Sequence, residues 1–253
     1  MLIKNEIPLL EYDMENEALV VPTHENMDLK LPQRCVFAFL GDFVESYAAE
    51  HQCRKAAVFD SVVKQFPVYV TEHNGEQLCF CASPVGSSAA VQFLDWLIGY
   101  GVKEVVAVGC CGTLVGFPEN VFLLPTRALR DEGTSYHYIA PSRYVDLNGL
   151  AVSALATTLQ KRDVPYTECM TWTTDGFFRE TKEKVAARKE EGCSVVEMEC
   201  AGLAACAQFR KVLFSELLFT ADTLANGYDS RGWGKQSYGT AFSIALDAVV
   251  AMC

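Results

Sequence analysis

Short apolar runs alternate along the chain with longer segments in which apolar residues recur three and four positions apart. The short runs predict β-strands, and they are Cys35 to Leu40, Val68 to Val70, Leu78 to Ala82, Val105 to Val108, Val121 to Leu124, Tyr166 to Thr171, Val195 to Val196 and Val212 to Ala221. The longer segments predict helices, and they run from the turn at Gly41-Asp42 to about Ala57, from Ser83 to Tyr100, from Asn148 to Arg162, from Thr181 to Glu191, from Cys200 to Phe209, and over the C-terminal residues. Alternating apolar strands and helices predict an α/β fold of three layers (α/β/α) with a mostly parallel central sheet.

The connecting segments carry signals of their own. Residues 1 to 34 are polar and interrupted by prolines, which predicts an extended arm. Asn74-Gly75 lies between two apolar runs and predicts a β-hairpin. Arg127 to Asp146 has no regular pattern, and a loop of this length points to a function or an interface.

Two predicted helices have a clear apolar face that should contact the sheet. In the helix ending at Tyr100 this face is formed by Val91, Phe93, Leu94, Leu97 and Ile98. In the helix starting at Asn148 the predicted inward residues are Leu150, Ala154, Leu155 and Leu159.

Length and composition favour a single domain over residues 1–253, because half of the chain is apolar and can bury a large core. The sequence has no apolar stretch long enough to span a bilayer, and Met1 to Glu6 does not resemble a signal peptide. We therefore expect a cytoplasmic protein without a membrane partner. The net charge of −11 argues against binding to nucleic acid, which requires clustered Lys and Arg.

Cysteines and histidines give no sign of a disulfide framework or a metal. The eleven cysteines are odd in number and several lie in apolar runs, so we expect reduced core thiols. Cys110-Cys111 lies in a glycine-bracketed turn, where a catalytic thiol is an alternative to a core thiol. The four histidines lack metal-ligand spacing, and we expect no metal and no organic cofactor.

The stretch Ser194 to Gly202 ends a predicted strand with two glutamates, Glu197 and Glu199. An unpaired carboxylate in an apolar setting is costly, so such residues usually have a defined role. In open α/β sheets, ligands bind beyond the carboxyl ends of strands. From spacing alone, two interpretations are open: a functional site, or a carboxylate that caps the following helix.

The stretch Val196-Glu197-Met198-Glu199-Cys200-Ala201-Gly202 resembles the signature of the purine nucleoside and uridine phosphorylase family (nucleoside phosphorylase-I type). Further segments match that family in order and spacing: Leu40-Gly41-Asp42, Val108 to Gly112, Asp131 to Tyr138, Thr174 to Phe178, and Thr220-Ala221-Asp222. The resemblance implies a distorted central sheet that partly closes like a barrel. It also implies a homodimer or a hexamer built as a trimer of dimers.

The resemblance implies roles for residues that would hold a nucleoside. Glu199 would accept hydrogen bonds from the ribose hydroxyls, Met198 would pack against the sugar, and His24 would reach the ribose of a neighbouring subunit. Other residues of this chain would contact the base. Phe177 would stack on it, Phe178 would line its pocket, and Asp222 would protonate purine N7 with support from Lys235 or, as a nearby substitute, Arg231.

On general grounds, the residues of the base site have simpler interpretations as well. Adjacent phenylalanines at a strand end are usually core residues, and an aspartate there can cap a helix. Uridine phosphorylases read uracil with a Gln and an Arg a few residues after the aromatic pair, and this chain has Thr181 and Glu183 at those positions. The resemblance therefore favours a purine base.

The predicted phosphate or nucleophile site consists of Gly41, Gly109, Cys110 and Lys64. Three positions that carry two arginines and a hydroxyl in the family are here Glu45, Ala107 and Cys110, and Lys64 stands near the place of an arginine donated by a neighbouring subunit. A carboxylate near phosphate disfavours its binding. Glu45 also resembles the glutamate with which methylthioadenosine/S-adenosylhomocysteine nucleosidases activate water.

The resemblance implies an enzyme of nucleoside metabolism and salvage. The first expectation is a pentosyltransferase that cleaves the N-glycosidic bond of a purine nucleoside with inorganic phosphate as co-substrate and yields the base and ribose 1-phosphate. Two alternatives remain: hydrolysis by water activated by Glu45, and a protein that binds nucleosides without cleaving them.

Overall fold

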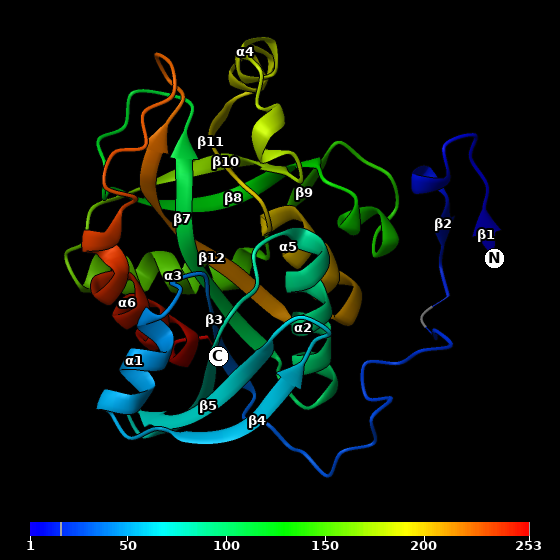
Figure 1. Cartoon of the computed structure of the whole chain (residues 1–253), viewed down its shortest axis with the longest axis vertical. Helices are drawn as coiled ribbons and strands as arrows, with labels where there is room; N and C mark the ends of the chain where they lie inside the picture. The colour runs from blue at the N-terminus through cyan, green and yellow to red at the C-terminus, as the bar shows by residue number, and fades with distance from the viewer. Residues whose placement is uncertain (16, 253) are drawn as a thin grey trace.

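The computed structural model describes residues 1–15 and 17–252 and is organised around one large β-sheet (Figure 1). Within these residues the sheet has ten strands in the order β11-β10-β8-β12-β7-β3-β6-β5-β4, with β9 beside β8. The strands are β3 (Arg34–Ala38), β4 (Arg54–Asp60), β5 (Gln65–His73), β6 (Glu76–Ala82), β7 (Glu104–Thr113), β8 (Phe122–Asp131), β9 (Tyr144–Asp146), β10 (Tyr166–Thr174), β11 (Cys193–Glu197) and β12 (Leu213–Thr223). The predicted α/β fold with a mostly parallel centre is confirmed.

The sheet closes on itself over half of its strands. Parallel pairs join β6, β3, β7 and β12, and a second parallel group contains β8, β10 and β11. Antiparallel pairs connect the two groups, β12 with β8 and β11 with β7. The interior of the resulting ring is filled by one apolar residue from each strand: Cys111, Leu123, Cys169, Val195 and Leu218. The partly closed, barrel-like sheet is thus present.

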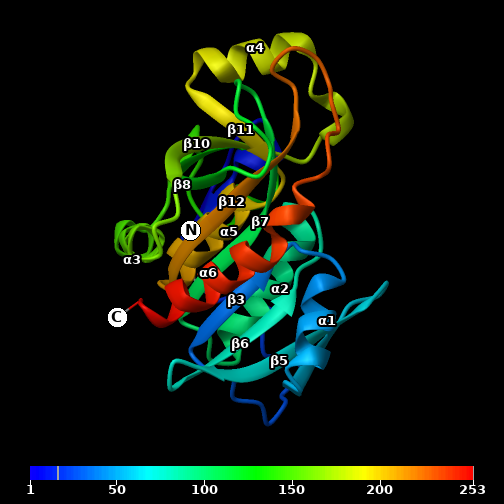
Figure 2. The same ribbon diagram turned by 90° about the vertical axis from the view of Figure 1, so that its left-hand side faces the viewer.

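Helices cover both faces of the sheet: α2 (Ser87–Gly99) and α5 (Cys200–Arg210) lie on one face, and α1 (Phe43–Glu50), α3 (Gly149–Lys161) and α6 (Tyr238–Val250) on the other. Helix α4 (Lys182–Glu190) packs against β11 at the end of the sheet (Figure 2). Side chains alternate across a strand, so Cys35 and Phe37 of β3 join the core under α2 and α5, while Val36 and Ala38 join the core under α1, α3 and α6. This alternation explains why the strand is apolar throughout.

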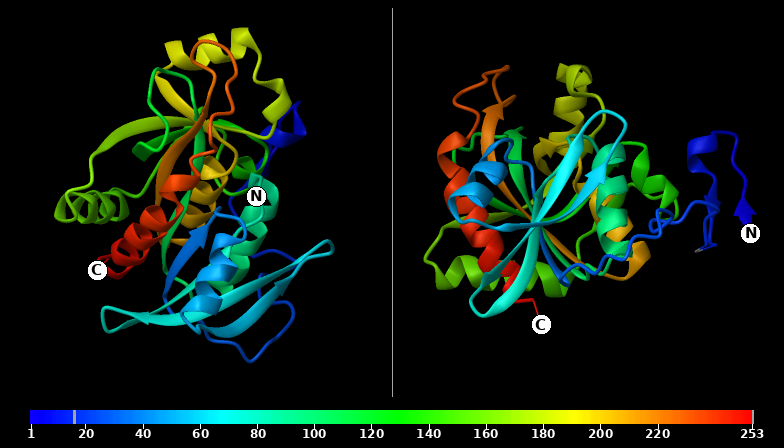
Figure 3. Two further views of the ribbon diagram at one scale, coloured as in Figure 1. Left: turned by 60° about the vertical axis from the view of Figure 1, so that its left-hand side comes forward. Right: turned by 60° about the horizontal axis from the view of Figure 1, so that its bottom comes forward.

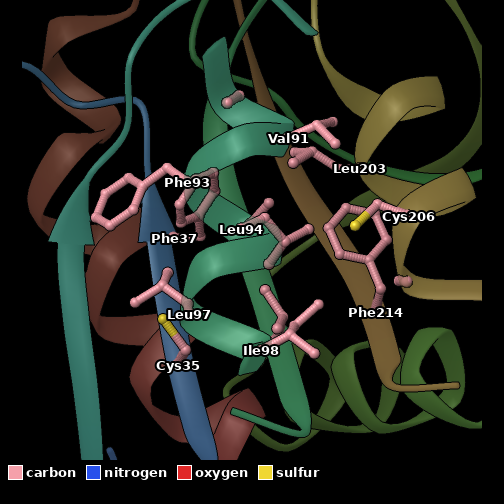
Figure 4. Close-up of a cluster of buried hydrophobic side chains, with 14 of the residues drawn as sticks. Cys35, Phe37, Val91, Phe93, Leu94, Leu97, Ile98, Leu203, Cys206 and Phe214 are labelled. Carbon is pink, nitrogen blue, oxygen red and sulfur yellow. The ribbon is translucent and has the colours of Figure 1, made fainter. Parts of the chain in front are cut away.

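The core under α2 and α5 is rich in aromatic contacts (Figure 4). Phe93 of α2 is fully buried, with its ring centroid 5.5 Å from that of Phe37 and 4.8 Å from that of Phe59. The apolar face predicted for this helix is therefore confirmed. It anchors α2, whose N-terminus follows the turn at Gly86.

Two helix predictions need correction. The helix after Gly41 ends at Glu50 and not near Ala57, because Gln52 adopts a left-handed conformation (φ 51°) and the chain then enters β4. Leu150 is 71% exposed and does not face inward. The Asn148 side chain caps α3 by accepting from the Leu150 and Ala151 amides. Ala151 is buried in place of Leu150, while Leu155 and Leu159 are buried as predicted.

The hairpin predicted at Asn74-Gly75 joins β5 to β6, and both residues have positive φ (51° and 80°), as the turn requires. The predicted loop after Arg127 is more regular than expected. β8 continues to Asp131, and the buried Arg130 guanidinium donates to Ser135, Ile139, Ala140 and Ser142. This guanidinium orders the loop that contains the 3₁₀ turn η2 (Thr134–His137).

The N-terminal residues form the expected arm. A small antiparallel pair, β1 (Leu2–Ile3) with β2 (Tyr12–Asp13), encloses the turn η1 (Pro8–Leu10), lies apart from the large sheet and contacts the turn η2 (Figure 3). No helix within the described residues is long and apolar enough to cross a membrane. The described cysteines are free, and all but Cys53 and Cys110 are buried.

The α3 helix offers a direct test of the packing. We predict that Leu159→Ala lowers the free energy of unfolding by about 2–5 kcal/mol, because its side chain is fully buried. Leu150→Ala on the same helix should change it by no more than about 0.5 kcal/mol. Urea unfolding of both variants measures the difference, and equal losses would mean that the helix presents a different face.

Candidate active site

The antiparallel pairing of β11 with β7 brings together residues that are far apart in the sequence. Val196 lies opposite Gly112, and a Cβ atom at Gly112 would lie 3.1 Å from the Val196 side chain and 3.2 Å from the Asp222 carboxylate. A larger residue would force these neighbours to shift, so glycine suits this close approach. Asp222 on β12 therefore lies beside the end of β11, the strand that leads into Glu199.

Glu199 is a buried carboxylate at the N-terminal end of α5. Its Oε1 accepts from the Gly86 amide at 2.5 Å and its Oε2 from the Met198 amide at 3.3 Å. Burial raises the pKa of Glu199 to about 8, and the charges of Glu197 and Asp175 act in the same direction. These two amides oppose the shift and leave a carboxyl group that titrates near neutral pH.

Asp222 is the second buried carboxyl group of this region. Burial raises its pKa, and the positive charge of Arg231 partly offsets this shift. The Arg231 guanidinium also donates to the Phe117 carbonyl at 3.0 Å, while Lys235 lies exposed in the turn η4 (Lys235–Ser237). Of the two predicted supporting cations, the structure thus brings Arg231 to the aspartate.

Glu180 is a candidate residue that the sequence did not suggest. It is partly buried directly after the turn η3 (Phe177–Arg179). Burial and the negative charge of Asp222 raise its pKa to about 7. In the sequence, Glu180 could be suspected only because it is an acidic residue close behind the aromatic pair. Its proximity to Asp222 depends on how the segment after β10 folds toward β12.

The aromatic pair lies at the open side of this region. Phe177 and Phe178 form an edge-to-face contact with ring centroids 5.1 Å apart. Phe177 is 38% exposed and Phe178 93% exposed, so neither belongs to the core. The general expectation that such a pair is buried in the core is wrong here, and both rings are available to a ligand or a partner.

Cys110 is close enough to both buried carboxyl groups for their charges to act on it. Burial raises its pKa to about 11, and the charges of Asp222 and Glu199 add to the shift. The side chain is therefore a neutral thiol at physiological pH, which argues against the catalytic-thiol alternative. Because the charges acting on this position are carboxylates, it is also an unfavourable place for a phosphate anion.

The two glycines predicted beside the nucleophile have different structural roles. A Cβ atom at Gly109 would lie 3.0 Å from the Phe39 side chain, so this glycine allows close packing of Phe39 against β7. Gly41 has a positive φ of 55° and open space around the missing Cβ. Its conformation favours glycine and turns the chain from β3 into α1.

Three predicted site residues, Glu45, Lys64 and His24, are exposed on the surface of the single chain. Glu45 is exposed on α1, where its charge acts on Tyr69. Lys64 is exposed after β4, with its ammonium 5.7 Å from the centre of the Phe66 ring. His24 is exposed in the arm and lines a groove of about 930 Å³ that also reaches Asp175. Their predicted roles would require a second subunit or a change in position.

The described residues contain no cluster of three or more His, Cys, Asp or Glu side chains that could hold a metal ion. The candidate site instead combines carboxyl groups with raised pKa, backbone amides and exposed aromatic rings. Carboxyl groups of this kind can accept hydrogen bonds when ionised and donate a proton when neutral.

Comparisons with known proteins agree with this architecture. The fold is similar to that of AMP nucleosidase from Bacteroides thetaiotaomicron (TM-score 0.71, 19% identity, 88% of this chain and 89% of that chain). It is also similar to purine nucleoside phosphorylase from Toxoplasma gondii in complex with immucillin-H (TM-score 0.74, 15% identity, 92% and 96%).

In sequence, the chain is 24% identical over 199 residues to guanosine phosphorylase from Halorubrum lacusprofundi, covering 75% of this chain and 82% of the relative. The family model described as phosphorylase superfamily matches residues 34–251, which include every strand of the large sheet and every helix named above. This chain therefore belongs to the phosphorylase superfamily.

Proposed function

We propose that this protein cleaves the N-glycosidic bond of purine nucleosides. The observation that carries the proposal is the pair of buried carboxyl groups, Glu199 and Asp222, which act on the same thiol, Cys110, from β11–α5 and β12. Bond cleavage needs one group that holds the ribose while positive charge develops on it, and another that delivers a proton to the departing base. The site offers a carboxyl group for each task.

In this proposal Glu199 binds the ribose. Its ionised carboxylate accepts hydrogen bonds from the 2′- and 3′-hydroxyls, and Met198 packs against the sugar. Because the pKa of Glu199 is about 8, much of its carboxyl group is protonated at neutral pH. The two ribose hydroxyls donate to the ionised form, so substrate binding favours that form.

Asp222 supplies the proton in this proposal. Burial raises its pKa and so favours the protonated acid, while Arg231 stabilises the carboxylate that remains after transfer to purine N7. Phe177 and Phe178 provide exposed ring faces for the base.

Inorganic phosphate is the first candidate for the nucleophile. The family match and the guanosine phosphorylase relative support it. In that reaction the C1′–N9 bond breaks, a phosphate oxygen bonds to C1′, and the products are the base and ribose 1-phosphate. Lys64 and His24, exposed on one chain, would then act in the site of a neighbouring subunit of a homodimer or hexamer.

Water is the second candidate, and one observation favours it. When Glu199 and Asp222 are ionised, they repel a phosphate anion near Cys110 but not a water molecule. Hydrolysis would yield free ribose. Glu45 could activate the water only if α1 or a neighbouring subunit carried it toward the site, because it is exposed and acts on Tyr69 in the single chain.

A screen of purified protein with guanosine, inosine, adenosine and uridine, with and without phosphate, tests the function. We predict base release from the purine nucleosides that requires phosphate and forms ribose 1-phosphate. Release without phosphate, with free ribose as the product, would identify the hydrolase. Cleavage of uridine alone would contradict the purine assignment, and binding without any release would identify a non-catalytic protein.

We predict that Asp222→Asn slows cleavage of guanosine by about 100- to 10,000-fold, the typical contribution of general acid catalysis. 7-Methylguanosine carries a positive charge on its base and needs no proton at N7, so its cleavage should change by only a few-fold. Steady-state rates for both substrates separate the chemical role from a structural one. Equal losses on the two substrates would point to a helix cap or a folding defect.

We predict that Glu180 controls guanosine binding near neutral pH. Its carboxylate, formed as pH rises through about 7, can accept hydrogen bonds from N1–H and the 2-amino group of guanine, so KM for guanosine should fall over that range. In Glu180→Gln the part of the pH dependence that guanosine does not share with adenosine should disappear, and KM for guanosine above pH 7 should rise about 10- to 100-fold. Adenosine lacks the N1 proton and is the control, and an identical response of both nucleosides would exclude this role.

A further inference from the structure

The first glutamate of the Glu-Met-Glu stretch has no role in the proposed chemistry, although it is buried at the end of β11. Its Oε1 accepts from the hydroxyls of Thr171 at 3.0 Å and Thr173 at 2.6 Å. Its Oε2 accepts from the amides of Glu199 at 2.7 Å and Cys200 at 2.6 Å. Glu197 thus joins β10 to the first turn of α5 through four hydrogen bonds.

These bonds change how α5 begins. The first amides of a helix need an acceptor, and the residue at the N-cap normally supplies it with its own side chain. Asn148 does so for α3, and Thr181 does so for α4. For α5 the N-cap residue is Glu199, whose side chain makes no capping bond within the described chain.

The capping of α5 is instead divided between two neighbours. Glu197 takes the amides of Glu199 and Cys200, and the Thr173 hydroxyl, which donates to Glu197, accepts from the Ala201 amide at 3.0 Å. The Glu199 carboxyl group is therefore released from its own helix. It turns to the Gly86 amide, across the entrance to α2.

The pKa shifts of the buried glutamates also indicate that Glu197 is the acceptor for these amides. Burial raises the pKa of both Glu197 and Glu216, a buried residue of β12 whose Oε2 lacks a hydrogen-bond partner within the described residues. Four hydrogen-bond donors oppose this shift at Glu197, whereas one donor, the Cys200 side chain, opposes it at Glu216. The anionic form is therefore better compensated at Glu197 than at Glu216.

We propose that Glu197 is the positioning residue of the ribose site: its carboxylate fixes the backbone of Glu199 and Cys200 so that the Glu199 side chain faces the sugar. The inference rests on the proposed role of Glu199. Glu197 itself touches no substrate. Its loss should therefore affect the two ribose hydroxyls through Glu199 and leave recognition of the base unchanged.

Two variants separate geometry from charge. Glu197→Ala removes the acceptor of both amides. Glu197→Gln keeps it, because the amide oxygen can accept from Glu199 and Cys200 while its NH₂ group faces the threonine hydroxyls, which can rotate to accept. Glu216→Gln is the matched control, since it alters a neighbouring buried carboxyl group that accepts from neither the Glu199 amide nor the Cys200 amide.

The first measurement compares guanosine with 2′-deoxyguanosine as probes. In Glu197→Ala the preference for guanosine in kcat/KM should fall about 10- to 100-fold, the worth of one charge-assisted hydrogen bond. The preference of guanosine over adenosine should not change. Glu197→Gln and Glu216→Gln should retain the ribose preference at the pH optimum.

The second measurement is the pH dependence of KM for guanosine. The groups facing Glu199 are Glu197, Asp175, the Cys110 thiol and Glu216. Because the charge of Glu197 helps to raise the pKa of Glu199 to about 8, Glu197→Gln should move the rise in affinity to lower pH. A purely structural residue would not shift this profile.

The third measurement needs no substrate. Hydrogen exchange at the amides of Glu199 and Cys200 should accelerate in Glu197→Ala and remain slow in Glu197→Gln. Unchanged exchange would overturn the inference. So would an unchanged ribose preference in Glu197→Ala while Glu199→Ala abolishes it. If Glu199→Ala itself leaves the ribose preference intact, the proposed function of the site is wrong and this inference falls with it.

Discussion

The antiparallel contact between β11 and β7 is the constraint on which the site depends. Parallel strands alone would leave the end of β11 at the margin of the sheet, beside β10. Closure of the ring through Val196 and Gly112 instead brings that end to the strand that carries Cys110. The apolar residues inside the ring make this closure favourable, since five strands each bury one side chain there. The position of the buried carboxyl groups is a consequence.

Much of this fold could be predicted because its signals are local. The hairpin at Asn74-Gly75 needs only two residues with positive φ, and the apolar run from Cys35 contains both sets of side chains that contact the two helical layers. The importance of Glu199 and Asp222 could be suggested as well, because each follows an apolar strand at a spacing typical of a known family. Neither inference requires knowledge of which strands become neighbours.

Other features depend on contacts that no local pattern encodes. Glu180 gains its raised pKa from Asp222, which lies on a strand that is distant in sequence. Arg231, and not Lys235, acts on Asp222 because of how the loop after β12 folds. Leu150 matched the apolar period of its helix, yet its side chain lies in solvent beside the cap at Asn148. Tertiary contacts decide the first two cases, and the two hydrogen bonds of the Asn148 cap accompany the third.

Several buried carboxyl groups can share this site because each is either compensated by hydrogen-bond donors or has a raised pKa. Glu197 receives four donors that compensate its negative charge, whereas Glu216 has an unpartnered oxygen among the described residues and burial raises its pKa well above the usual value. Glu199 and Asp222 lie between these limits, each with fewer or weaker compensating groups. Their charge can therefore respond to a bound ligand.

A neutral nucleoside with hydroxyl donors favours the ionised form of Glu199, whereas an anion near Cys110 needs a cation that this cluster does not supply. The same cluster that suits the ribose thus leaves the choice of nucleophile to residues outside it.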